Sequence, residues 1–192
     1  IKTSNNHPAF QAPLQRRGKL KNMKKTFLLL LATLAFSCKP CKIKQETQEV
    51  SKQTIATILD NWHKAASEAN YNDFFNAMAD ESVFIGTDAT ENWNKKDFQT
   101  YAKPHFDKGK AWSFKAIERN IYISNDQKTV WFDELLDTQM KICRGSGVLI
   151  FEKGSWKIKH YVLSMTIPNQ ISKDVIPLKT PIDDKITLQK KK

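Results

Sequence analysis

The stretch from Trp112 to Ser164 constrains the fold more than any other part of the chain. Apolar and polar side chains alternate along it with a period of two, and β-branched and aromatic residues are frequent, which predicts β-strands. Two breaks fix how the strands pair: Ser124 faces Thr129 across four polar residues, and Glu152 faces Ser155 across a two-residue loop of the kind that hairpins favour. A third turn is expected between these two. The stretch therefore predicts four antiparallel strands in an up-and-down meander.

This register places one set of alternating side chains on the same face of the sheet. The set comprises Ile117, Arg119, Ile121, Ile123, Val130, Phe132, Glu134, Leu136, Leu149, Phe151, Trp156, Ile158, His160, Val162 and Ser164. The face is apolar except at Arg119, Glu134, His160 and Ser164, so functional groups are expected there. The opposite face also carries a large apolar surface, which is expected to be covered rather than exposed to water. It comprises Tyr122, Trp131, Leu135, Val148, Ile150, Tyr161 and Leu163.

Arg119 and Glu134 lie directly opposite each other in this register. A buried carboxylate is costly unless it is paired, so the arginine explains how the glutamate is tolerated inside. The pair is either a closed ion pair that fixes the register, or a site in which the guanidinium binds an oxygen and the carboxylate moves a proton. His160, expected opposite Gly147, is either a hydrogen-bonded core residue or an acid or base. A one-residue slip would exchange Glu134 with Asp133.

Helices are expected before the meander. Ser51 is a suitable N-cap for a helix that runs to Ala69, and a second short helix is expected over residues 72–79. A strand is expected over residues 82–85, and a third helix begins with a capping box at Asn94. The first helix has one apolar stripe at helical spacing, made of Ile55, Ile58, Leu59, Trp62, Ala65, Ala66 and Ala69.

Three polar residues of this part are further site candidates. His63 lies at the edge of the apolar stripe and is either a half-exposed helix histidine or a ligand contact. Asp88 and Glu91 lie in a polar loop and are either groups at the mouth of a pocket or helix-entry residues. After Pro168 the periodic pattern ends, so residues 170–192 are expected to form an irregular tail.

Residues 23–37 have the pattern of a secretory signal, with a charged start and an apolar run too short to span a bilayer. The segment that ends the run, Leu34-Ala35-Phe36-Ser37-Cys38, resembles a bacterial lipobox. This resemblance implies acylation of Cys38 and anchoring at the periplasmic face of a bacterial membrane; an ordinary signal peptide with an incidental cysteine is the alternative. Residues 38–50 then form a flexible tether, and residues 1–22 are interpreted as an over-extension upstream of the true start.

The formal charge of +11 suggests a nucleic-acid partner, but its distribution argues against one. Seven of the 31 basic residues precede residue 38, where there is no acidic residue, and residues 51–168 carry 15 basic and 15 acidic residues. We therefore expect no nucleic-acid partner. Cys38 and Cys41 have a C-x-x-C spacing, but acylation of Cys38 would consume its thiol, and Cys143 has no obvious partner. No metal or cofactor is expected, and no motif of nucleotide hydrolysis, serine esterase or zinc protease chemistry is found.

Helices followed by a long antiparallel meander predict an α+β fold. Five motifs occur in a characteristic order: Leu59-Asp60-x-Trp62-His63-Lys64-Ala65-Ala66, Val83-Phe84-Ile85-Gly86-Thr87-Asp88-Ala89-Thr90-Glu91, Trp131-Phe132-Asp133-Glu134, Gly145-Ser146-Gly147-Val148-Leu149 and Trp156-Lys157-Ile158. With them, residues 51–169 resemble a SnoaL-like domain of the nuclear-transport-factor-2-like superfamily. The resemblance implies a cone-shaped fold in which a curved antiparallel sheet wraps the N-terminal helices and leaves a cavity on its concave face. It also implies a homodimer that forms through the outer sheet face.

Two functions are compatible with this fold. The first is a binding module whose concave cavity holds a small, partly apolar molecule. The second is an enzyme similar to the isomerases, cyclases and dehydratases of the superfamily, in which Glu134 or His160 transfers a proton and Arg119 stabilises an oxyanion, without a cofactor. A closed Arg119–Glu134 pair with no room beside it would argue against both. The expected ligand contacts are Trp62, His63, Asp88, Glu91, Trp112, Phe132 and Ser164.

Overall fold

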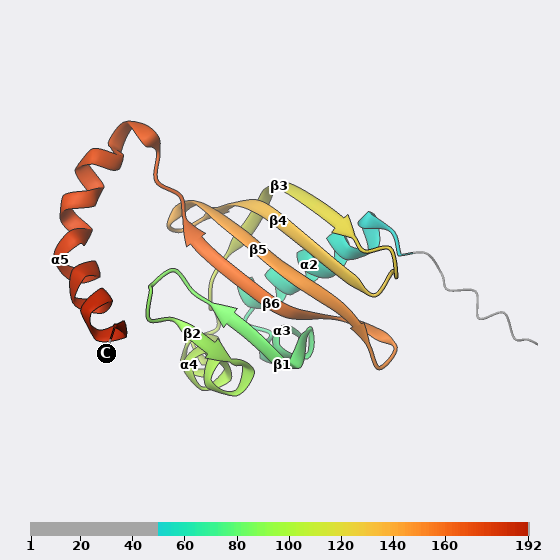
Figure 1. The fold of residues 1–192 in the computed structure, drawn as a ribbon. Helices are drawn as coiled ribbons and strands as arrows, with labels where there is room; N and C mark the ends of the chain where they lie inside the picture. The colour runs from blue at the N-terminus through green and yellow to red at the C-terminus, as the bar shows by residue number, and fades with distance from the viewer. Residues whose placement is uncertain (1–49, 192) are drawn as a thin grey trace, which may run out of the picture. The chain divides into compact units, whose positions relative to one another are not determined.

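The computed structural model describes residues 50–191. In order, these residues form α2 (Lys52–Ser67), α3 (Tyr71–Asn76), β1 (Met78–Ile85), β2 (Asn92–Asn94), α4 (Lys95–Asp107), β3 (Phe114–Ile123), β4 (Thr129–Thr138), β5 (Lys141–Glu152), β6 (Ser155–Met165), the 3₁₀ turn η1 (Asn169–Ile171) and α5 (Ser172–Lys190), as Figure 1 shows. The predicted leader, the predicted acylation site Cys38, residues 1–22 and the tether up to residue 49 lie outside the described residues. Within residues 50–191, no helix is both long and apolar enough to cross a membrane.

Helix α2 begins where the sequence predicts. The side-chain oxygen of Ser51 accepts a hydrogen bond from the backbone N–H of Thr54 at 3.1 Å and so caps the helix. The helix ends at Ser67, two residues before the predicted end, and Ala69 turns the chain with a positive φ of 55°. Its buried face comprises Ile55, Leu59, Trp62, His63, Ala65 and Ala66.

The six strands form one curved, unclosed sheet in the order β2-β1-β6-β5-β4-β3, and α2 lies across one face of it (Figure 1). The predicted meander is confirmed, because β3, β4, β5 and β6 pair consecutively and antiparallel. The backbone N–H of Ser124 donates to the carbonyl of Thr129 at 2.9 Å, and Glu152 pairs with Ser155, as expected. The sheet is nevertheless mixed, since β1 pairs in parallel with β6.

The predicted register is wrong in the second half of β6. Leu149 pairs with Ile158, whereas the preceding residue Val148 pairs with His160. Lys159 is therefore an extra residue on the β6 side, which is a β-bulge. Beyond this bulge, every side chain of β6 faces the side opposite to the predicted one.

The bulge exchanges the residues of β6 that face the core. Tyr161 and Leu163, predicted on the outer face, are buried, and Tyr161 lies opposite Gly147 in place of His160. His160, Val162 and Ser164, predicted to face inward, instead alternate with these two on the outer face. The physical reason is that the bulge buries a tyrosine ring and a leucine where a regular strand would have buried a histidine and a valine.

A second bulge corrects the prediction in β3. Ala116 pairs with Leu136, and Glu118 pairs with Leu135, so Ile117 is the extra residue. Its side chain, predicted to face inward, is 59% exposed. β3 is an edge strand, and an irregular edge of this kind disfavours pairing with the edge of another sheet.

An aromatic cluster fills the space between the helices and the concave face of the sheet. Trp62 stacks on Phe74 with 5.0 Å between ring centroids and meets Tyr161 edge-on at 4.8 Å. Phe84 stacks on Phe98 at 4.0 Å. The buried aromatic residues of this cluster are Trp62, Phe74, Phe75, Phe84, Phe98, Phe106, Phe132 and Tyr161. Much of the space that the sequence assigned to a cavity is thus occupied by the chain's own side chains.

Two further predictions change at the ends of elements. α3 ends earlier than the predicted helix over residues 72–79, and β1 already begins at Met78. The cap at Asn94 is confirmed, since its side-chain oxygen accepts a hydrogen bond from the backbone N–H of Asp97 at 2.9 Å. The irregular tail after Pro168 is wrong, because this segment forms η1 and the 19-residue helix α5, none of whose side chains is buried.

The bulge in β6 predicts a contrast between two neighbouring residues. Tyr161→Ala removes a fully buried ring and should lower the free energy of unfolding by about 3–5 kcal/mol. His160→Ala changes the outer face and should cost less than about 1 kcal/mol. Urea denaturation of both variants measures the difference. Equal losses, or a larger loss for His160→Ala, would show that β6 keeps the regular register.

Candidate functional site

The carboxylate of Glu134 in β4 is the centre of a buried polar network. Its side chain has no exposed surface. One oxygen, Oε1, lies 2.8 Å from Nε2 of His63 and accepts a hydrogen bond from the hydroxyl of Tyr161 at 3.2 Å. The other, Oε2, accepts from Nε of Arg119 at 2.8 Å. Both oxygens are therefore occupied by donors from α2, β3 and β6, and Nε2 of His63 carries the hydrogen in this arrangement.

Arg119 connects this network to the backbone of α2. Its Nη1 donates to the carbonyl of Ala56 at 3.1 Å and to the carboxylate of Asp60 at 2.8 Å. Its Nη2 lies 2.8 Å from Oε2 of Glu134, within ion-pair distance but without the geometry of a hydrogen bond. The guanidinium is thus held between two carboxylates, and its side chain is only 9% exposed.

The charges in the network fix its protonation states. Burial alone would raise the pKa of Glu134, but the hydrogen bond and charge of His63, followed by those of Arg119, hold the pKa below its usual range. Burial and the neighbouring carboxylate raise the pKa of Tyr161 well above its usual range, so the phenol stays protonated and donates. For Arg119, the charge of Glu134 and the hydrogen bond to Asp60 outweigh burial and raise the pKa.

The lack of a side chain at Gly145 leaves space for the side chains of the network. Gly145 pairs with Glu134 on one side and with Leu163 on the other. A Cβ atom at this position would lie 2.4 Å from the hydroxyl oxygen of Tyr161 and 3.0 Å from Oε1 of Glu134. The absence of a side chain here lets the tyrosine reach the carboxylate. At Gly147, which the predicted register placed opposite the His160 side chain, the space that a Cβ atom would take is approached by the Phe132 ring and the His160 carbonyl.

This arrangement favours a structural role over proton transfer. A carboxylate that is fully buried, whose oxygens already accept from three side chains and whose pKa is lowered, is a weak base with no surface open to a substrate. The network ties α2 to strands β3, β4 and β6, and it removes the cost of burying Glu134. The sequence left two interpretations of the Arg119–Glu134 pair open, and the geometry is that of the closed ion pair.

The structure brings together only some of the predicted site residues. His63, Arg119 and Glu134 meet in the network. The sequence left open whether Asp133 or Glu134 faces inward, and in the structure it is Glu134. Asp133 contacts Asn120 and Arg144 on the outer side. The other predicted residues do not join the network. Trp62 and Phe132 are in the core, and Trp112 is half-buried beside Phe74. Asp88 and Glu91 lie in the loop after β1, and His160 and Ser164 are on the outer side of β6.

Two members of the network were missed by the sequence analysis. Tyr161 was assigned to the outer face because the bulge at Lys159 has no signal in an alternating strand. Asp60 precedes His63 by three residues and therefore lies on a neighbouring part of the same helix surface, a spacing that could have suggested a shared site.

An open pocket lies next to the network, between the first turns of α2 and strand β3. We call it the α2–β3 pocket, and its volume is about 310 Å³. It is lined by Lys52, Gln53, Ala56, Arg119, Asn120, Ile121 and Tyr122. Arg119 thus belongs to both the network and the pocket wall. A second groove of about 510 Å³ lies between α2 and α3 and includes Asn61, Glu68 and Asp73.

No group of three or more His, Cys, Asp or Glu side chains that could hold a metal ion occurs in the part of the chain that the structure describes. Cys143, the one cysteine within residues 50–191, is buried and lies 3.6 Å from the hydroxyl of Thr138.

The close approach at Gly145 predicts a rescue between two substitutions. Gly145→Ala should cost about 1–3 kcal/mol of stability through overpacking against Tyr161 and Glu134. Tyr161→Phe alone should cost about 1 kcal/mol through the lost hydrogen bond. In the double variant the phenylalanine makes room for the methyl group, so the loss should be smaller than the sum by at least about 0.5 kcal/mol. Ser146→Ala serves as the control, and strictly additive losses would contradict the geometry.

Comparisons with known proteins agree with this fold. The structure is similar to an NTF2-like protein of unknown function from Pseudomonas putida KT2440, with 12% sequence identity, a TM-score of 0.52, and coverage of 62% of this chain and 88% of that chain. It is also similar to an NTF2-like protein from Cytophaga hutchinsonii ATCC 33406, with 15% identity, a TM-score of 0.50, and coverage of 61% and 100%. At these identities the likeness shows the fold alone. No curated protein matches the chain.

The sequence itself matches the family model described as a SnoaL-like domain over residues 55–168. This range contains the whole sheet and the network around Glu134, and it leaves out α5. The chain therefore belongs to the SnoaL-like domain family and has an NTF2-like fold.

Proposed function

We propose that this protein is a binding module that is anchored to a membrane and takes up a small, partly apolar molecule, and that it does not use Glu134 for catalysis. The observation that carries the proposal is the closure of the network: Glu134 is fully buried, and both of its oxygens accept hydrogen bonds from protein donors. The network then has a different use, which is to hold Arg119 rigidly in the wall of the α2–β3 pocket.

The α2–β3 pocket has the composition of a site for an anionic molecule with an apolar body. Its volume of about 310 Å³ is at the lower end of the range for small-molecule sites. Lys52 and Arg119 supply positive charge, whereas Ala56 and Ile121 supply apolar surface. The proposal therefore moves the ligand from the concave interior, where Trp62 and Phe132 pack in the core, to the edge of the sheet beside β3.

The enzyme hypothesis has less support. An isomerase, cyclase or dehydratase of the expected kind would need Glu134 or His160 as acid or base and Arg119 as oxyanion donor. Glu134 would first have to be released by His63, Tyr161 and Arg119, and His160 lies on the outer side of β6. No observation within residues 50–191 favours this reaction over binding.

The proposal includes the membrane anchor and the homodimer. The lipobox-like segment that ends at Cys38 supports acylation of this cysteine and a location at the periplasmic face of a bacterial membrane. The balanced charge of residues 51–168 supports a partner other than nucleic acid. The apolar side chains on the outer sheet face, among them Tyr122 and Trp131, support pairing of two copies.

Filling the α2–β3 pocket tests the binding proposal. Ala56→Phe places a ring in the pocket while leaving the backbone carbonyl that accepts from Arg119. The protein purified from its host should retain a co-purifying small molecule in native mass spectrometry, and Ala56→Phe should reduce that retention at least about 10-fold. Asn61→Phe, which fills the groove between α2 and α3, is the matched control. Equal retention by both variants would remove the ligand from the α2–β3 pocket.

The anchor is tested by lipid labelling in cells. The wild-type chain should incorporate radiolabelled palmitate and sediment with membranes, and Cys38→Ala should do neither, because the acylated thiol is gone. Cys41→Ala should behave as the wild type. Membrane association and labelling that persist in Cys38→Ala would contradict acylation at this residue.

A further inference from the structure

Helix α5 carries a narrow apolar stripe, and none of its side chains is buried in the described chain. Ile171, at the end of η1, is followed at intervals of four, three, four and four residues by Val175, Leu178, Ile182 and Ile186. These spacings place all five side chains on one side of a helix. Leu178 is 77% exposed and Ile182 is 62% exposed, and no residue of α5 packs against the core. We call these five residues the α5 stripe.

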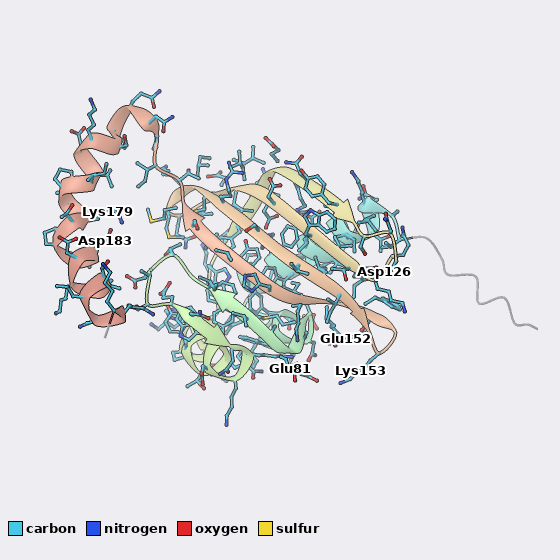
Figure 2. The ribbon with its side chains drawn as sticks, viewed as in Figure 1. Glu81, Asp126, Glu152, Lys153, Lys179 and Asp183 are labelled. Carbon is cyan, nitrogen blue, oxygen red and sulfur yellow. The ribbon has the colours of Figure 1, made fainter. Side chains whose placement is uncertain are left out.

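Helix α5 has little intrinsic support. It contains Pro177 and Pro181 in its interior, and proline is the least favourable residue inside an isolated helix. No side chain caps its N-terminus. An ion pair between Lys179 and Asp183, one turn apart, is part of its local stabilisation (Figure 2), but such exposed pairs contribute little to the stability of a helix. A helix of this kind is stable when its apolar side is covered by another surface.

The outer face of the sheet is the second apolar surface without cover. Tyr122 and Trp131 are 44% and 47% exposed, and their rings stack with 5.8 Å between centroids and an interplanar angle of 12°. The other apolar residues of this face are Leu135, Ile142, Val148, Ile150 and Val162, which come from β4, β5 and β6. Tyr161 and Leu163, which the sequence placed here, are in the core, so the face is smaller than predicted.

We propose that the α5 stripe of one copy packs on the outer sheet face of a second copy, so that two copies exchange their C-terminal helices reciprocally. This inference rests on the proposed homodimer and names the segment that completes its interface. The dimensions match, because 19 helical residues extend about 28 Å and the ten residues of β4 extend about 33 Å. A reciprocal exchange covers both apolar surfaces in both copies.

A contact of the α5 stripe with a second copy is favoured over a contact within one chain, because in the single chain both apolar surfaces are uncovered. Within one chain, none of the α5 side chains is buried, while Tyr122 and Trp131 remain about half exposed. The family match ends at residue 168, before α5 begins, so the helix is an addition to the domain and not part of its core.

The test uses the full chain in density-matched detergent, with sedimentation equilibrium at micromolar concentration. The wild type should be a dimer. Leu178→Glu with Ile182→Glu should weaken the dimer at least about 100-fold, because charge replaces two side chains of the stripe. Ile176→Glu with Leu188→Glu is the matched control, since these apolar residues of α5 are similarly exposed but lie off the stripe, and it should remain dimeric. Trp131→Ser should also weaken the dimer. Circular dichroism confirms that each variant is folded.

Each other outcome has a definite meaning. If Trp131→Ser breaks the dimer and the stripe variant does not, the homodimer stands and the role of α5 is refuted. If the stripe variant breaks it and Trp131→Ser does not, α5 pairs with something other than the sheet, and the proposal is overturned. A monomeric wild type overturns both the homodimer and the exchange. Co-expression of a Leu178→Cys copy with a Trp131→Cys copy should give a disulfide-linked pair, and its absence under oxidising conditions would contradict contact between copies.

Discussion

The burial of one carboxylate sets the conditions for much of this structure. Glu134 has no exposed surface, and an ionised carboxylate in such a place destabilises a fold by several kcal/mol unless donors surround it. The donors come from separate parts of the chain: His63 from α2, Arg119 from β3 and Tyr161 from β6. Because the three elements must meet at one point, the network fixes how α2 lies on the sheet.

Other features of the molecule follow from this requirement. The bulge at Lys159 turns Tyr161 inward, where its hydroxyl reaches Glu134, and Gly145 leaves the space for it. Asp60 and the carbonyl of Ala56 hold the far end of Arg119, so the guanidinium reaches the wall of the α2–β3 pocket in a fixed orientation. In the function we propose, Glu134 therefore positions Arg119, and a rigid, positively charged pocket wall suits recognition of a ligand better than transfer of a proton.

The sequence predicted the regular parts of the fold and, as site residues, three of the five side chains of the network. Alternation and turn residues were enough to pair Ser124 with Thr129 and Arg119 with Glu134, since a register follows from the turn that starts it. The same logic failed at Lys159, because one extra residue reverses all later side chains without changing the alternating pattern. The pattern marks His63 as a candidate ligand contact at the edge of the stripe, but it does not predict the contact with Glu134, because that contact joins positions 71 residues apart. The helix α5 was missed because Pro177 and Pro181 indicate a break, whereas the helix continues through both.

The central claim is that Glu134 is ionised at neutral pH and is a closed member of a structural network. Titration of its side-chain carboxyl carbon by NMR, in the full-length protein, tests this claim most directly. Donors that outweigh burial should give a pKa below the ordinary glutamate value of about 4.3. A carboxyl that titrates above that value, between about pH 5 and 8, where a proton-abstracting base would operate, would contradict the closed network and restore the enzyme hypothesis.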